Sequence, residues 1–210
     1  MPSLFTQDLF TQRRNYDDGN VRIGQLDRIW YDYSRNAFYR GDGVTPGGIL
    51  IGGAIVGTQY YGSFYDTTAL QTISNVSAAY TVTISNTYAA YGVSLDNNDI
   101  VFANGGTYEI TFSLQFDNTD NARQRINIWF QKNGTNIDDS NSQFQIENQT
   151  AGIEAKLIAV TPFITPSLVA GDRITLKWNA TSTAVHIATL PVVDGTIPRT
   201  PGVIVTVKQL

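Results

Sequence analysis

Residues 105–116 read GGTYEITFSLQF, and from Tyr108 onward apolar and polar side chains alternate without a break. A repeat of two residues is the pattern of a β-strand that buries one face and leaves the other in water. The stretch therefore predicts a long strand at the edge of a core.

Two later strands show the same alternation and are bounded by turn residues. The first, residues 125–132, ends on Lys132-Asn133-Gly134, where Asn and Gly supply the positive φ of a tight hairpin turn. The second, residues 173–179, follows Gly171-Asp172. The core side chains expected from the three strands are Tyr108, Ile110, Phe112, Leu114, Ile128, Phe130, Leu176 and Trp178.

The order of these motifs resembles the jelly-roll head of the complement and tumour-necrosis-factor superfamily. A Gly-x-Tyr strand comes first, then a strand ending in Lys-Asn-Gly, and then a Gly-Asp turn that leads into a strand. Bacterial and phage proteins use the same head. The resemblance covers about residues 60–210. It implies a homotrimer that binds or displays and does not catalyse.

Turn residues separate further short segments with strand character, at the spacing of a β-sandwich, and none has a helical period. The fold class expected is all-β: an antiparallel jelly-roll sandwich head with an N-terminal extended arm and β-hairpin. The strands expected in the head, residues 58–210, are 60–65, 69–73, 80–84, 100–102, 108–116, 125–132, 142–146, 153–163, 173–179, 184–190 and 202–208.

The composition of the 210 residues excludes several function classes. There is no Cys and one His, so Cys–His nucleophiles, thiolate metal cages and multi-histidine metal sites are ruled out. The net charge of −4 provides no basic footprint for nucleic acid. Residues 1–9 lack the pattern of a signal peptide, and the most apolar run, 47–57, is too short and glycine-rich to span a bilayer. We therefore expect no nucleic-acid or membrane partner and no cofactor.

Residues 1–20 contain a near-duplication, Leu4-Phe5-Thr6-Gln7 and Leu9-Phe10-Thr11-Gln12. One interpretation is a disordered leader. The other is an attachment arm in which Leu4, Phe5, Leu9 and Phe10 become ordered against another protein, because exposed Leu-Phe pairs are unusual in a solvated tail.

Residues 21–57 predict a β-hairpin and a glycine-rich connector. Segments 29–33 and 37–40 flank a loop of hairpin length, and GDGVTPGG follows at residues 41–48. The hairpin together with this string resembles a module of fibre and appendage proteins of tailed bacteriophages, where it lies between an attachment segment and a distal domain. This resemblance implies a virion location.

Three polar loops of the head are candidates for facing a partner, since they offer many hydrogen-bonding groups and little net charge. The loops are 96–99, 117–121 and 134–141. The first two could also hold Ca²⁺, although they lack the Gly and Glu of an EF-hand loop, and solvated turns are the simpler interpretation. The candidate residues are Asp96, Asn97, Asn98, Asp117, Asn118, Asn136 and Asp138.

Trp129 and Arg125 lie at the polar positions of their strand, which alternate with its apolar ones. A Trp on this side needs a covering surface, which is either a neighbouring subunit or a local loop. His186 lies between Val185 and Ile187, where a hydrogen-bonded structural role is the simpler interpretation. We expect no enzyme activity.

The sequence thus predicts a phage virion structural protein that is a homotrimer, attached through its N-terminal arm. As a short tail-fibre or receptor-binding appendage, it would bind a host surface glycan or protein. The alternatives are a capsid decoration protein and a secreted lectin-like binding protein.

Overall fold

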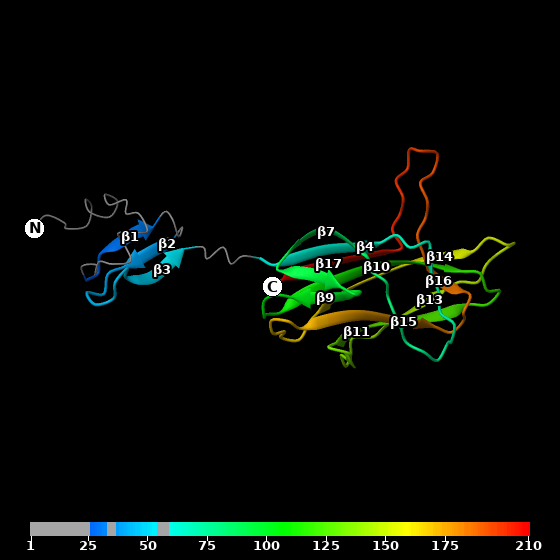
Figure 1. Ribbon diagram of the computed structural model, residues 1–210, viewed down its shortest axis with the longest axis horizontal. Helices are drawn as coiled ribbons and strands as arrows, with labels where there is room; N and C mark the ends of the chain where they lie inside the picture. The colour runs from blue at the N-terminus through cyan, green and yellow to red at the C-terminus, as the bar shows by residue number, and fades with distance from the viewer. Residues whose placement is uncertain (1–25, 33–36, 54–58) are drawn as a thin grey trace, which may run out of the picture. The chain divides into compact units, whose positions relative to one another are not determined.

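The computed structural model describes residues 26–32, 37–53 and 59–210, and the chain divides into two compact units, Met1–Thr58 and Gln59–Leu210 (Figure 1). The proposed arm residues Leu4, Phe5, Leu9 and Phe10 lie outside the described residues.

The first unit contains a three-stranded antiparallel sheet in the order β1-β2-β3. Its strands are β1 (Ile29–Asp32), β2 (Ala37–Arg40) and β3 (Ile49–Gly53). The expected hairpin is β1 and β2. The third strand lies where the sequence predicts only a connector, so this expectation was wrong. The short apolar run of β3 pairs with β2 despite the glycines on either side of it.

Asp42 organises the turn of the GDGVTPGG string between β2 and β3. Its carboxylate accepts hydrogen bonds from the backbone amides of Val44, at 3.0 Å, and Thr45, at 2.7 Å, and from the Thr45 hydroxyl at 2.5 Å. These bonds, that of the Thr45 side chain first, lower the pKa of Asp42 to about 2. Gly43, Gly47 and Gly48 have positive φ, which explains the density of glycine here.

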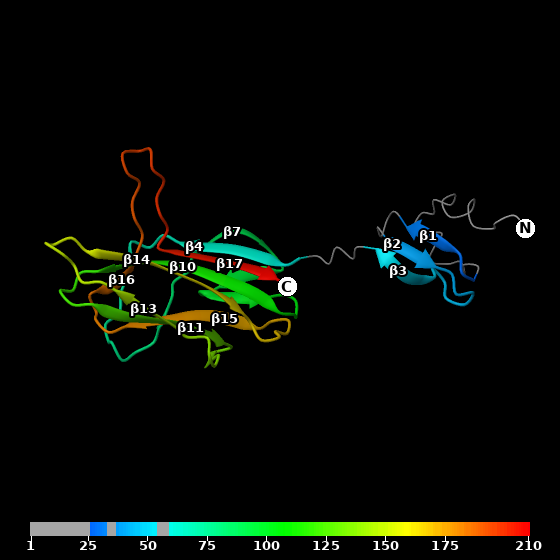
Figure 2. The ribbon, with the colours of Figure 1, turned by 180° about the vertical axis from the view of Figure 1, so that it is seen from behind.

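The second unit, here called the head, consists of two seven-stranded sheets with antiparallel pairing (Figures 1 and 2). The first sheet contains β4 (Tyr61–Asp66), β5 (Leu70–Gln71), β7 (Asn86–Tyr91), β10 (Tyr108–Asn118), β14 (Ala155–Ile164), β16 (Val185–Ala188) and β17 (Val203–Gln209). The second sheet contains β6 (Tyr80–Thr81), β8 (Val93–Asp96), β9 (Asp99–Phe102), β11 (Gln124–Lys132), β12 (Thr135–Asn136), β13 (Ser142–Ile146) and β15 (Arg173–Ala180).

The chain crosses repeatedly between the sheets, as in a jelly-roll. After β10 in the first sheet it forms β11 and β13 in the second, returns for β14, crosses again for β15 and ends in β16 and β17. In the first sheet β10 lies between β14 on one side and β16 and β17 on the other. The expected all-β, antiparallel jelly-roll sandwich is confirmed, and each expected head strand overlaps an observed one.

The apolar side chains that alternate with polar ones along the strands fill the space between the sheets. The core side chains expected from the sequence are all at most 1 % exposed. Aromatic rings link the two layers: Phe112 lies 6.0 Å from Phe130, and Phe116 lies 5.6 Å from Trp178, between ring centroids. The alternation seen in residues 108–116 therefore marks the inner face of the first sheet.

Two strands of the first sheet, β17 and β16, share one side of β10. The side of β10 that faces β17 is paired with β17 as far as Leu114 and with β16 from Phe116 onward. The residues between β16 and β17 leave the sheet as a projecting hairpin, closed by the bridges Leu190↔Thr200 and Val193↔Ile197. It rises on the side away from β11 and β15 (Figures 1 and 2).

The three sequence motifs meet at one end of the head. Gly106 and Leu168 exchange both backbone hydrogen bonds, at 3.0 and 2.8 Å. Asp172 accepts a hydrogen bond at 2.8 Å from the side chain of Asn133. The residues that carry the jelly-roll resemblance are thus in mutual contact, because each closes a turn at the same edge of the sandwich.

Candidate functional site

The outer faces of the two sheets differ in character, and this difference defines two candidate surfaces. On the first sheet, the outward side chains of β14 are largely apolar: Ile158 is 59 % exposed, Val160 51 % and Ile164 59 %. The burial of β14 alternates as in a strand with one face in water, yet apart from Lys156 its outward side chains are apolar. An apolar row of this kind in water indicates a surface that is covered by a partner.

Two more apolar side chains lie on the same face of the sheet, beyond the polar outward residues of β10. Val160 is opposite Ser113 on β10, Ser113 is opposite Ile204 on β17, and Ile204 is opposite Tyr65 on β4. These four side chains form one row along the outer face. The apolar face, as we call it, consists of Ile158, Val160, Pro162, Ile164, Ile204 and Tyr65.

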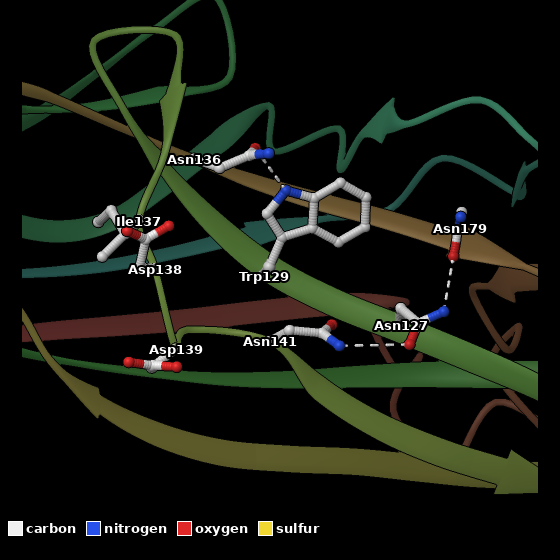
Figure 3. A pocket seen from close by; sticks show the side chains of 8 residues that line it. All are labelled: Asn127, Trp129, Asn136, Ile137, Asp138, Asp139, Asn141 and Asn179. Carbon is white, nitrogen blue, oxygen red and sulfur yellow. Dashed lines mark hydrogen bonds between the residues drawn. The ribbon is translucent and has the colours of Figure 1, made fainter.

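The outer face of the second sheet is polar and holds a pocket of about 360 Å³ (Figure 3). Its lining residues are Asn127, Trp129, Asn136, Ile137, Asp138, Asp139, Asn141 and Asn179. They come from β11, β12, β15 and the loop between β12 and β13. We call this the Trp129 pocket.

Side-chain amides hold the Trp129 pocket together. The indole Nε1 of Trp129 donates to Asn136 Oδ1 at 2.8 Å, and Gln131 donates to the same oxygen at 2.9 Å. Asn127 is opposite Asn179 in the β11–β15 ladder and donates to its Oδ1 at 3.0 Å. The rim and the floor of the pocket are thus fixed by hydrogen bonds (Figure 3).

The loop that borders the pocket is anchored from below. The buried hydroxyl of Ser140 donates to the carbonyl of Ile137 at 2.7 Å and accepts from the amide of Phe130 at 3.1 Å. The amide of Ile137 donates to the carbonyl of Phe130 at 2.9 Å. This network fixes the loop that brings Asp138 and Asp139 to the lining of the pocket.

The sequence predicts three of the pocket residues, in two separate roles. Asn136 and Asp138 are candidates there for a partner-facing loop, and Trp129 for a subunit interface. The structure brings them together and leaves Trp129 half-buried beside the local loop. Asn141 ends the predicted partner-facing loop 134–141. Asn127 and Asn179 were not among the candidates, and only the strand register places Asn179 next to Asn127 and Trp129.

Arg125 lies on the same outer face as Trp129, with an exposed side chain opposite Gln145. Its role at a subunit interface stays a prediction. For Trp129, the local loop is the cover that the structure describes, and this is the other alternative that the sequence offers.

The candidate residues Asp96, Asn97 and Asn98 form the turn between β8 and β9. Asn97 and Asn98 have positive φ, as in a two-residue hairpin turn. Asp96 forms an ion pair with Arg173, which raises the pKa of the arginine, and Asn98 accepts a hydrogen bond from the Ile84 amide at 3.0 Å. Much of this turn's polar capacity is used within the chain.

Asp117 and Asn118 were wrongly predicted to face a partner. Both are buried, because β10 continues to Asn118 and its last residues pair with β14 and β16. Asn118 donates to the backbone carbonyls of Ala122 and Glu147, at 3.0 and 2.8 Å. Their polar character suits internal hydrogen bonding and not an exposed loop.

His186 has the structural setting that the sequence suggests. Its Nδ1 lies 3.0 Å from Asp117 Oδ1, and Lys156 also approaches this carboxylate, at 3.6 Å. Within the described part of the chain, no hydroxyl group is hydrogen-bonded to the imidazole.

Over residues 26–32, 37–53 and 59–210, no group of three or more His, Asp or Glu side chains is placed to hold a metal ion. The same residues contain no helix with the length and apolar character needed to cross a bilayer.

Comparison with known proteins gives a fold neighbour and no family. No family model matches the chain, and no curated protein matches it. Among solved structures, the crystal structure of murine APRIL at pH 5.0 matches 73 % of this chain and all of that one, with 11 % sequence identity and a TM-score of 0.44. At this distance the match adds no argument about function.

Proposed function

We propose that the chain is a structural, non-enzymatic protein of a tailed-phage virion, in which a homotrimeric jelly-roll head is displayed as a short tail-fibre or receptor-binding appendage. The observation that carries the proposal is the apolar face of the first sheet. Three exposed β-branched side chains on one strand, with Ile204 and Tyr65 on the same face of the sheet, need a covering surface, and a further copy of the same chain provides one.

The division of the head into two unlike faces supports display. If the apolar face is covered in the trimer, the Trp129 pocket on the opposite sheet stays open to solvent. An assembly of this kind presents three equivalent pockets outward.

The virion location rests on the resemblance of the hairpin and GDGVTPGG string to phage appendage modules. The described part of the first unit fits a docking role, since Phe38, Ile49, Leu50 and Ile51 are exposed on a small sheet. The residues proposed to attach to other virion proteins, Leu4, Phe5, Leu9 and Phe10, precede this sheet in the chain.

Light scattering on the full chain tests the assembly. Three copies of 23.1 kDa should give about 69 kDa at micromolar concentration. A monomer under these conditions would contradict both the proposed trimer and the proposed role of the apolar face as its interface.

Phage particles test the location. Deletion of residues 1–20 should leave the trimer intact and abolish incorporation into particles. Normal incorporation of the shortened chain would contradict the attachment arm.

Adsorption separates the appendage from a capsid decoration protein. An excess of soluble protein should block adsorption of the phage to its host. If adsorption is unaffected and particles without the protein lose capsid stability, decoration is the correct role.

A further inference from the structure

We propose that the Trp129 pocket binds a neutral pyranose sugar, with one face of the sugar ring on the indole and its hydroxyls on the surrounding amides and carboxylates. This inference rests on the proposed function as a display head, and it names the ligand class of that head. It also assigns a specific surface, within one subunit, for the ligand.

The aromatic platform is the first part of the argument. Trp129 is half-buried and lies on the polar outer face of β11 (Figure 3). Its only polar atom is already bonded to Asn136, so the ring is held in place while it borders an open pocket. The electron-rich face of an indole attracts the partly positive C–H groups of an apolar sugar face.

The hydrogen-bonding groups around the ring are the second part. Within the described contacts, the NH₂ groups of Asn136 and Asn179 remain as donors, because each amide is engaged through its oxygen. Asn141 donates to Asn127 and keeps its own oxygen as an acceptor. A hydroxyl both donates and accepts, so a mixed set of donors and acceptors suits a polyol.

Charge selects between classes of sugar. Asp138 and Asp139 line the pocket, and its eight lining residues include no Lys or Arg. Lys177 is opposite Trp129 on β15, but its amine donates to Thr81 at 2.7 Å. The two carboxylates accept hydroxyl hydrogens and would repel an acidic sugar, so the pocket favours a neutral one.

Pre-organisation is the last part of the argument. Ser140 ties the bordering loop to β11, and Gln143 donates to Asn127 at 3.0 Å from the other side. The polar groups are therefore placed before binding, which lowers the entropic cost of capturing a small ligand.

The test is a calorimetric or NMR titration of the full chain with glucose, galactose, mannose and N-acetylglucosamine. Galacturonic acid and N-acetylneuraminic acid serve as anionic counterparts. At least one neutral sugar should bind saturably by tens of millimolar, a range usual for a single small site, and the acidic sugars should bind more weakly. Absence of saturation by every neutral sugar, or equal binding of an acidic one, would overturn the proposal.

Variants locate the site. Trp129→Ala should weaken binding by about tenfold or more, since it removes the platform. Asn136→Asp keeps the acceptor for Trp129 and removes a donor, so it should also weaken binding in a protein of unchanged fold. Tyr88→Ala, at an exposed aromatic residue on β7, is the matched control and should bind normally. Unchanged binding by both pocket variants would overturn the assignment.

Light scattering on the same samples keeps the two proposals separate. A trimer that binds no neutral sugar would contradict only the sugar site. A monomer that binds sugar through Trp129 would contradict the trimeric assembly and support the sugar site.

Discussion

The amine of Lys132 lies 2.8 Å from Asp172 Oδ2, so the turn that ends β11 is tied to the turn that begins β15. Asn133 and the backbone amide of Val169 donate to the same carboxylate, each at 2.8 Å. Asp172 is buried, and its partners satisfy both of its oxygens. It is the point at which two of the fold's turns are held together.

This arrangement predicts a pH dependence of stability. The hydrogen bond from Lys132, followed by that from Val169, lowers the pKa of Asp172 from 3.8 to about 2. A lowered pKa means that the charged carboxylate stabilises the folded state above pH 3.8, and that this contribution is lost as the pH falls from 3.8 towards 2.

Asp172→Asn should therefore reduce the free energy of unfolding by about 1–3 kcal/mol at neutral pH. The difference in the free energy of unfolding between this variant and the native protein should become smaller below pH 3.8. Thermal melts across this range measure both effects. Asp139→Asn, at an exposed carboxylate, is the control, and a difference that stays constant with pH would contradict the ion-pair argument.

The core predicts a large effect at Phe112, which is 1 % exposed and packs near Phe130. Phe112→Ala should cost about 3–5 kcal/mol in the free energy of unfolding, because it leaves a cavity between the sheets. Chemical denaturation checks this. Ser94→Ala, on the exposed face of β8, should change stability by less than about 0.5 kcal/mol.

The apolar face predicts a variant that loses the trimer. Val160→Glu places a charge in the centre of the row and should shift the full chain towards monomer, with little effect on its circular-dichroism spectrum. Val76→Glu changes a valine of similar exposure, 43 % against 51 %, in a loop away from this face. Light scattering should show a trimer for Val76→Glu, and a trimer for both variants would place the interface elsewhere.

At the base of the projecting hairpin, position 202 has no room for a side chain. A Cβ added at Gly202 would lie 3.1 Å from the carbonyl carbon of Ala188 and 3.2 Å from Thr189 Oγ1. Gly202→Ala should destabilise the head by about 1–3 kcal/mol, because backbone cannot move aside as a flexible side chain does. A melting temperature equal to that of the native protein would show that the hairpin base is free to relax.

The sequence predicted the sandwich because alternation is strong wherever one face of a strand is buried. It missed β7, where the run from Thr87 to Tyr91 is exposed and shows no alternation. It also missed β8 and β12, because four and two residues are too few for a clear pattern. It also took Asp117 and Asn118 for a loop, since polar residues at a strand end resemble a turn. Only the ladder reveals that β14 and β16 cover them.

The candidate site was predictable in part for a similar reason. Trp129 stands out by its residue type, and Asn136 and Asp138 by the composition of their loop. Asn179 is 50 positions from Trp129 in the chain, and its place in the pocket depends on the pairing of β11 with β15. The alternation of a strand shows which face each residue occupies, but for strands far apart in the chain it does not show which residues lie opposite one another.

The position of β4 has a mechanical consequence for a head tethered through its N-terminal side. β4 lies between β17 and β7, so a pull on the chain that acts along β4 is resisted by hydrogen bonds on both of its sides. The ladder bonds of an antiparallel pair run perpendicular to the strands, so this pull loads them together in shear instead of opening them one after another. A head held by its ligand on one side and by its tether on the other would thus meet force in the direction in which its first strand is hardest to extract.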